Sequence, residues 1–85
     1  MTLAGKRVLI TGGGTGTGAD LARGFAAAGA EVVVTGRRAE PLEKVAGALP
    51  GARAITADVT DEASVKAMFD QAGPCDIVIA NAGAS

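Results

Sequence analysis

The sequence is 85 residues long and nearly neutral, with 48% hydrophobic residues and a formal net charge of −1. Proteins that bind nucleic acid or an anionic membrane surface through charge carry a basic excess, so this composition argues against both kinds of partner. The single cysteine excludes an intrachain disulfide, and without histidine it has no partner for a metal site. No run of residues approaches the ~18 apolar residues of a membrane span. The length allows at most one small domain, and the cysteine usage fits a reducing, cytoplasmic setting.

The first part of the chain alternates short apolar runs with a stretch of helical period. Residues 7–11 (RVLIT) form a compact apolar run that ends at glycine, which predicts a buried strand. Residues 18–29 place Leu21 and Phe25 on one face of an amphipathic helix. Residues 31–36 (EVVVTG) predict a second strand, and its three consecutive valines indicate that both of its faces are covered.

The same alternation continues to the end of the chain. Residues 39–49 predict a second helix, and residues 52–58 predict a third, weaker strand. Residues 60–73 predict a third helix with Thr60 as its N-cap. The apolar positions of that helix predict a buried stripe made of Val65, Met68, Phe69 and Ala72. Residues 76–83 (DIVIANAG) contain the most hydrophobic strand of the chain.

The element order β-α-β-α-β-α-β predicts an α/β fold of the Rossmann-like, doubly wound type. Connections of helix length join parallel strands, and right-handed crossovers then favour the strand order 3-2-1-4. The first two helices would cover one face of the sheet and the third helix the other. An apolar fourth strand at a sheet edge invites further pairing. We therefore expect residues 1–85 to be the N-terminal part of a single larger domain.

Glycine residues crowd the junction between the first strand and the first helix, at residues 12–18 (GGGTGTG). Glycines there let the chain turn sharply and let a diphosphate approach backbone N–H groups, and the start of a helix adds unpaired donors and a positive dipole end. Thr11, Thr15 and Thr17 would add hydroxyl donors. The alternative is a flexible surface loop that binds nothing, but the strand-to-helix context favours phosphate binding.

Two motifs resemble those of the short-chain dehydrogenase/reductase family, and the resemblance extends over the whole chain. Residues 11–18 have the spacing T-G-x-x-x-G-x-G, and residues 81–83 read NAG after the fourth strand. The resemblance implies the N-terminal half of an NAD(P)-binding Rossmann domain in an oxidoreductase. Such an enzyme transfers a hydride between nicotinamide and a carbonyl or secondary alcohol. Thr17 departs from the family pattern, which has a branched apolar residue there, and leaves the local geometry open.

The end of the second strand predicts which cofactor is preferred. A carboxylate at this place would favour NAD, but the chain reads TGRR and has no acid there. The guanidinium groups of Arg37 and Arg38 suit the 2′-phosphate of NADP(H), and in this family an arginine immediately after the strand marks NADP preference. A basic residue within the glycine loop, another family feature, is replaced by Thr15. The alternative is a pair of solvated arginines, paired with Glu40 or Glu43.

The resemblance also assigns the adenine end of the cofactor. The Asp58 carboxylate would accept a hydrogen bond from the adenine amino group, and the backbone N–H of Val59 would donate to a ring nitrogen. Alternatively, Asp58 only ends the strand while Asp61 caps the next helix. The NAG segment would line the floor beneath the adenosine ribose and the nicotinamide. The full set of expected cofactor-binding residues is Gly12, Gly14, Thr15, Gly16, Thr17, Gly18, Arg37, Arg38, Asp58, Val59, Asn81, Ala82 and Gly83.

The chain lacks the family's catalytic residues. Those are a serine and a tyrosine–lysine pair beyond the fourth strand, whereas this sequence contains no tyrosine. We therefore predict that the 85-residue chain alone is inactive, that the complete protein takes a small carbonyl or alcohol substrate, and that it forms a homo-oligomer. The alternative is a stand-alone, non-catalytic module that binds a dinucleotide or a partner.

Overall fold

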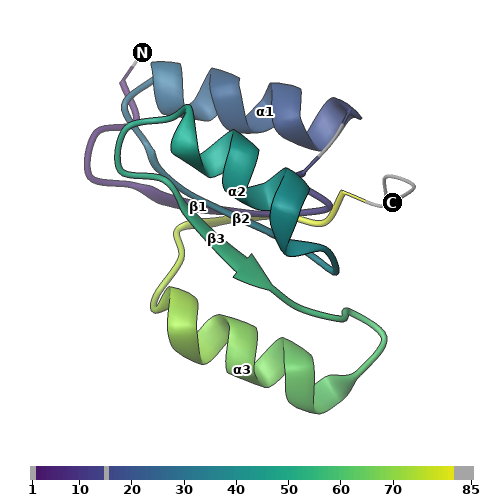
Figure 1. The fold of residues 1–85 in the computed structure, drawn as a ribbon. Helices are drawn as coiled ribbons and strands as arrows, with labels where there is room; N and C mark the ends of the chain where they lie inside the picture. Colours follow the sequence, from purple (N-terminus) through teal and green to yellow (C-terminus); the bar gives the residue numbers. More distant parts are fainter. Residues whose placement is uncertain (1, 15, 82–85) are drawn as a thin grey trace.

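The computed structural model describes residues 2–14 and 16–81, and it contains the seven expected elements in the expected order (Figure 1). They are β1 (Arg7–Thr11), α1 (Gly16–Ala27), β2 (Glu31–Gly36), α2 (Ala39–Gly47), β3 (Arg53–Thr56), α3 (Glu62–Ala72) and β4 (Ile77–Ile79). Among the described residues, no helix combines the length and the apolar character needed to cross a membrane.

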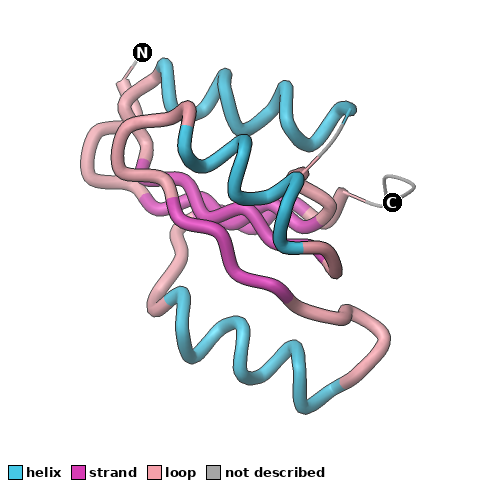
Figure 2. The backbone as a smooth tube through the Cα atoms, viewed as in Figure 1, coloured by secondary structure: helices cyan, strands magenta, loops and turns pink. Residues whose placement is uncertain are grey.

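The four strands form one parallel sheet in the order β3-β2-β1-β4, which confirms the predicted topology. In the register of the sheet, Leu9 of β1 lies between Val33 of β2 and Val78 of β4. Figure 2 shows α1 and α2 on one face of the sheet and α3 on the other. The fold is therefore α/β and Rossmann-like, and the carboxyl ends of all four strands meet at one edge.

The alternation of side chains along β1 and β2 builds two apolar layers. The even-numbered residues of β1 and β2 pack with Leu42 of α2 and with α1. The odd-numbered residues, Leu9 and Val33, pack with Met68 of α3. Both faces of β1 and β2 are consequently buried, as expected for a parallel sheet with helices on each side. The fully buried strand residues that make these layers are Val8, Leu9, Ile10, Val32, Val33 and Val34.

Two predictions about α3 are wrong. Phe69 is 39% exposed instead of buried, because it lies about 100° around the helix from Met68, at the flank of the stripe that contacts the sheet. The N-cap is Asp61, whose carboxylate accepts a hydrogen bond from the N–H of Ala63 at 3.0 Å. Thr60 does not cap the helix, because its hydroxyl donates to Asp58 at 2.6 Å.

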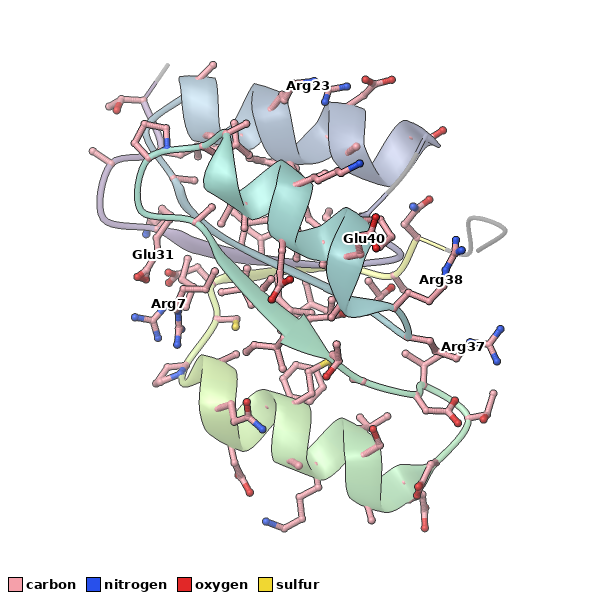
Figure 3. The ribbon with its side chains drawn as sticks, in the orientation of Figure 1. Arg7, Arg23, Glu31, Arg37, Arg38 and Glu40 are labelled. Atoms are coloured by element: carbon pink, nitrogen blue, oxygen red, sulfur yellow. The ribbon has the colours of Figure 1, made fainter. Side chains whose placement is uncertain are left out.

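Charged groups pair with each other at the amino edge of the sheet, by which we mean the end where the four parallel strands begin (Figure 3). Arg7 Nε lies 2.7 Å from Glu31 Oε2, and Arg7 Nη1 donates to the carbonyl of Ala72 at 2.9 Å. Arg53 Nη2 donates to the same carbonyl at 2.9 Å. The hydrogen bond with Arg7 lowers the pKa of Glu31 and, in return, raises the pKa of Arg7. These contacts attach the end of α3 to β1, β2 and β3.

Candidate functional site

The glycine segment forms an irregular turn at the carboxyl edge of the sheet, between β1 and α1. Residues 12–14 are a turn, and α1 begins at Gly16. Gly12 and Gly16 have φ angles of 64° and 56°, in the left-handed region that side chains disfavour. The predicted strand–turn–helix context of the glycines is therefore present.

Two glycines, one in this turn and one in the first turn of α1, allow close approach of the backbone. A Cβ on Gly18 would lie 2.0 Å from the carbonyl oxygen of Gly12, and a Cβ on Gly13 would lie 2.8 Å from Cβ of Val34. The N–H of Gly13 donates to the carbonyl of Thr35 at 3.0 Å. The turn is consequently packed against β2 and the first turn of α1. Gly13 is not among the residues predicted for the site, although its place within three consecutive glycines is a usable signal.

The end of β4 is joined to the same turn by side-chain hydrogen bonds. The Asn81 amide donates to the carbonyl of Gly12 at 3.2 Å. The Thr11 hydroxyl accepts from the N–H of Asn81 at 3.0 Å and donates to the carbonyl of Ile79 at 3.3 Å. Thr11 was expected to offer its hydroxyl to a ligand, but the structure uses it to fix β4 against β1.

The two arginines after β2 lie at the same edge and are exposed (Figure 3). Arg38 is the N-cap residue of α2, and its side chain makes no ion pair with Glu40 or Glu43 in the described part of the chain. Beside it is a cleft of about 680 Å³ whose lining includes Gly14, Arg38, Glu40 and Lys44. Lys44 is a cation that the sequence analysis missed, since only the fold brings this position of α2 next to the glycine turn.

The segment after β3 is shaped by hydrogen bonds to Asp58. Its Oδ1 accepts from the N–H of Thr60 at 2.9 Å and from the Thr60 hydroxyl at 2.6 Å. Its own N–H donates to Ser64 Oγ at 2.8 Å. The two bonds from Thr60 lower the pKa of Asp58, and the positive charge of Arg37 contributes a smaller effect in the same direction. Asp58 is therefore a carboxylate at neutral pH, and the adjacent Val59 is 59% exposed.

One buried hydroxyl near this edge is unexplained by the packing. Thr35 Oγ1 is buried and has no hydrogen-bond partner among the described residues. Its residue lies opposite Thr11 of β1 and Ile55 of β3 in the register of the sheet. No sequence signal identifies such a group, because a threonine in an apolar strand normally finds a partner.

Most of the predicted site residues lie together at the carboxyl edge. The turn, the end of β2, the segment after β3 and Asn81 meet there, where ligands bind in open α/β sheets. Thr17, in the first turn of α1, also lines an apolar groove with Leu21 and Phe25. Three of the predicted residues lie outside the described part of the chain: Thr15, Ala82 and Gly83.

Comparison with known sequences gives a consistent assignment. Residues 6–85 match the family model described as short chain dehydrogenase. A "Probable oxidoreductase" of Streptomyces antibioticus is 50% identical in an alignment that covers 98% of this chain and 30% of that protein. Gluconate 5-dehydrogenase of Gluconobacter oxydans is 44% identical in an alignment that covers 96% of this chain and 35% of that protein. The chain thus spans about a third of the length of these curated relatives.

Solved structures share the fold. A short chain dehydrogenase/reductase family protein matches with a TM-score of 0.92 at 45% identity, over 99% of this chain and 36% of that one. RhlG of Pseudomonas aeruginosa, solved with NADP, matches with a TM-score of 0.84 at 36% identity, over 99% of this chain and 37% of that one. The 3-ketoacyl-(acyl-carrier-protein) reductase of Brucella melitensis, solved with NADH, gives 0.80 at 40% identity, over 91% and 34%.

Proposed function

Since this chain belongs to the short-chain dehydrogenase/reductase family, we propose that it forms the NADP(H)-binding, N-terminal part of a single Rossmann domain in an oxidoreductase. The observation that carries the proposal is the close approach of Gly18 to Gly12, where a Cβ on Gly18 would lie 2.0 Å from the Gly12 carbonyl oxygen; we call this glycine-lined approach the cradle. A turn packed this tightly at the start of a 12-residue helix suits an anion, because helix N–H groups and the helix dipole both favour negative charge there.

The residues at the carboxyl edge fit a dinucleotide from end to end. The glycine turn would hold the pyrophosphate, and Asp58 with Val59 would contact the adenine. Asn81 donates to the carbonyl of Gly12 in the turn, so it would hold the turn in place beneath the cofactor. We propose that Thr15, Ala82 and Gly83 also bind the cofactor. The nicotinamide supplies or accepts the hydride when the cofactor is bound. β4 is the last strand in the order of the sheet, so its outer edge would accept a further strand of the same sheet.

The preference for NADP(H) rests on charge at the end of β2. Arg37 and Arg38 follow β2, whose carboxyl end, Thr35 and Gly36, has no carboxylate to repel a 2′-phosphate. Lys44 adds a third cation beside the same cleft, whereas Glu40 opposes it. Solved relatives were obtained with NADP in one case and with NADH in another, so family membership alone does not decide the preference.

Measuring the dissociation constants of NADPH and NADH for the complete protein that carries this chain tests the preference. We expect tighter binding of NADPH, and Arg37→Ala should weaken NADPH binding about tenfold while changing NADH binding little, since charge-assisted bonds to phosphate contribute about 1.5–3 kcal/mol. Arg23→Ala is the matched control, because Arg23 is an exposed arginine on α1 that pairs with Asp20. Equal losses for both cofactors would remove Arg37 from the 2′-phosphate site.

The chemistry on the substrate would reside outside these 85 residues. The family uses a tyrosine as acid and base, and the chain has none. We expect a small carbonyl compound or secondary alcohol as substrate, no turnover by the 85-residue chain alone, a cytoplasmic location and a homo-oligomeric complete protein. Turnover of an alcohol by the isolated chain above background would contradict this division of roles, and sedimentation of the complete protein tests the oligomer.

A further inference from the structure

Among the residues that the structure describes, the segment that follows β3 has one backbone donor without an acceptor. Within residues 57–61, the N–H of Ala57 donates to the carbonyl of Gly36 at 2.8 Å, and that of Asp61 to the carbonyl of Asp58 at 3.1 Å. The N–H of Asp58 is bound by Ser64 Oγ, and that of Thr60 by the Asp58 carboxylate. The remaining N–H, on Val59, has no acceptor among the residues that the structure describes.

Two hydroxyl groups hold this segment, one through the Asp58 carboxylate and one through the Asp58 N–H. Thr60 fixes the rotamer of the Asp58 carboxylate through two bonds to one oxygen, Oδ1, and neither bond uses Oδ2. Ser64, in the first turn of α3, fixes the backbone at Asp58. The other end of α3 is attached to the sheet by Arg7 and Arg53, so the serine is presented from an anchored helix.

We propose that Thr60 and Ser64 are positioning residues that hold the Asp58 carboxylate and the Val59 N–H as a rigid acceptor–donor pair for an adenine base. This inference rests on the proposed function and specifies how its adenine site discriminates. Adenine offers an amino donor and a ring-nitrogen acceptor on one edge. Hypoxanthine offers a carbonyl acceptor and a ring N–H donor at the same two places, so the pair faces two mismatches with that base.

Rigidity is what the two hydroxyls contribute. A carboxylate with a fixed rotamer loses less conformational freedom on binding than a mobile one. A carboxylate and an N–H that are held in place and face a mismatched base stay without hydrogen bonds, which weakens the binding of that base. The low pKa of Asp58 keeps the group an acceptor throughout the neutral range. Without Thr60 or Ser64, the carboxylate and the N–H could turn toward water, and the distinction between the two bases would weaken.

The test compares NADPH with reduced nicotinamide hypoxanthine dinucleotide phosphate, using the complete protein. We expect the wild type to bind the adenine cofactor more tightly. In Thr60→Val and in Ser64→Ala, the dissociation constant of the hypoxanthine cofactor divided by that of NADPH should fall about threefold to tenfold, the size expected for one hydrogen bond. The fall should come from weaker binding of the adenine cofactor.

Three controls separate positioning from a general structural role. Thr60→Ser and Ser64→Thr retain the hydroxyls and should restore the ratio. Thr2→Val removes a hydroxyl that accepts the N–H of Ala4 at 3.2 Å, close to Ala28 and away from the site, and should leave the ratio unchanged. A lower thermal midpoint in the Thr60 or Ser64 variants with an unchanged ratio would overturn the positioning role.

The proposed function and this inference fail in different ways. If the wild type binds both dinucleotides equally, dinucleotide binding stands but the acceptor–donor pair does not read the base, and the inference is overturned. If the wild type binds neither dinucleotide, the proposed function fails and the inference fails with it. A reduced ratio in both alanine-type variants, with restoration by the hydroxyl-bearing ones, supports the inference.

Discussion

The two edges of the sheet treat their polar groups in opposite ways (Figure 3). At the amino edge, Arg7 binds Glu31 and the carbonyl of Ala72, and the Asp76 carboxylate accepts the N–H of Arg7 at 2.8 Å. At the carboxyl edge, the glycine turn presents backbone without side chains, and the arginines after β2 are exposed. The amino edge thus uses its charges to hold the fold together. The carboxyl edge instead exposes backbone and cationic side chains at the place where we propose that a ligand binds.

The largest expected effect comes from filling the cradle. Gly18→Ala places a Cβ 2.0 Å from a backbone oxygen that cannot rotate away, so the turn must move. We expect a loss of NADPH affinity of at least about 100-fold and destabilisation of about 3 kcal/mol, the range of severe overpacking. Calorimetric titration and chemical denaturation measure the two effects.

Gly24→Ala is the matched control on the same helix. A Cβ on Gly24 meets nothing within 4 Å, so this change should stabilise the protein by about 0.5–1 kcal/mol through helix propensity. NADPH affinity should stay at the wild-type value. If Gly18→Ala binds NADPH as well as Gly24→Ala does, the cradle is not the pyrophosphate site.

Breaking the amino edge should separate stability from binding. Arg7→Met keeps an unbranched apolar stem but removes the guanidinium bonds to Glu31 and to the end of α3. The thermal midpoint should fall by several degrees, while NADPH affinity stays within about twofold because distant sites act independently. Lys6→Met, a change of the same kind at the neighbouring exposed position, should leave the midpoint nearly unchanged. A large loss of affinity in Arg7→Met would mean that the two edges are coupled.

Acid should weaken the amino edge through Glu31. Its pKa in the folded protein lies below the ordinary value of 4.5 because of the bond with Arg7. The group therefore stabilises the fold fully above that ordinary value, and this contribution is lost as the pH falls through the lowered folded pKa. Glu31→Gln should be less stable than the wild type at neutral pH and should lose stability less steeply below pH 4.5. Thermal unfolding at a series of pH values measures both differences. Glu43→Gln on α2 serves as control, and an identical acid slope in wild type and Glu31→Gln would contradict this account.

The smallest effect concerns the unpartnered hydroxyl near the carboxyl edge. Thr35→Val replaces a buried hydroxyl without a partner by a methyl group of similar size. We expect a gain in stability of about 1 kcal/mol, the cost of an unsatisfied buried group at the low end of its range. Thr56→Val, at an exposed position of β3, should change stability by less than about 0.5 kcal/mol. A loss of stability in Thr35→Val would show that its hydroxyl has a partner.

The architecture could be predicted because it depends on periodicity and chain connectivity. The valines of β2 and the helical spacing around Leu42 identify their elements, and helix-length crossovers limit the strand order. Choices between neighbouring polar groups could not be predicted in this way. Thr60 and Asp61 are both good N-caps by type, and only the position of Asp58 decides that Thr60 bonds backward and leaves the cap to Asp61.

The same limit applies to the site. The glycine turn and the arginines after β2 are predictable because both lie within short motifs. Lys44 joins their cleft only through the packing of α2, and the partner of Gly13, Val34 of β2, is identified only by the structure, although three consecutive glycines signal a close approach. The hydroxyl of Thr11 was assigned to a ligand, although in the fold it serves β4.

Amide chemical shifts during a titration with NADPH test most directly whether the backbone N–H groups of the glycine segment after β1 bind a pyrophosphate. In the complete, isotopically labelled protein, the largest changes should fall on the N–H groups of residues 12–18, and ADP should reproduce them although it lacks the nicotinamide. Shifts confined to the amino edge or to the outer surface of α3, with the N–H groups of residues 12–18 unmoved at saturation, would contradict the account.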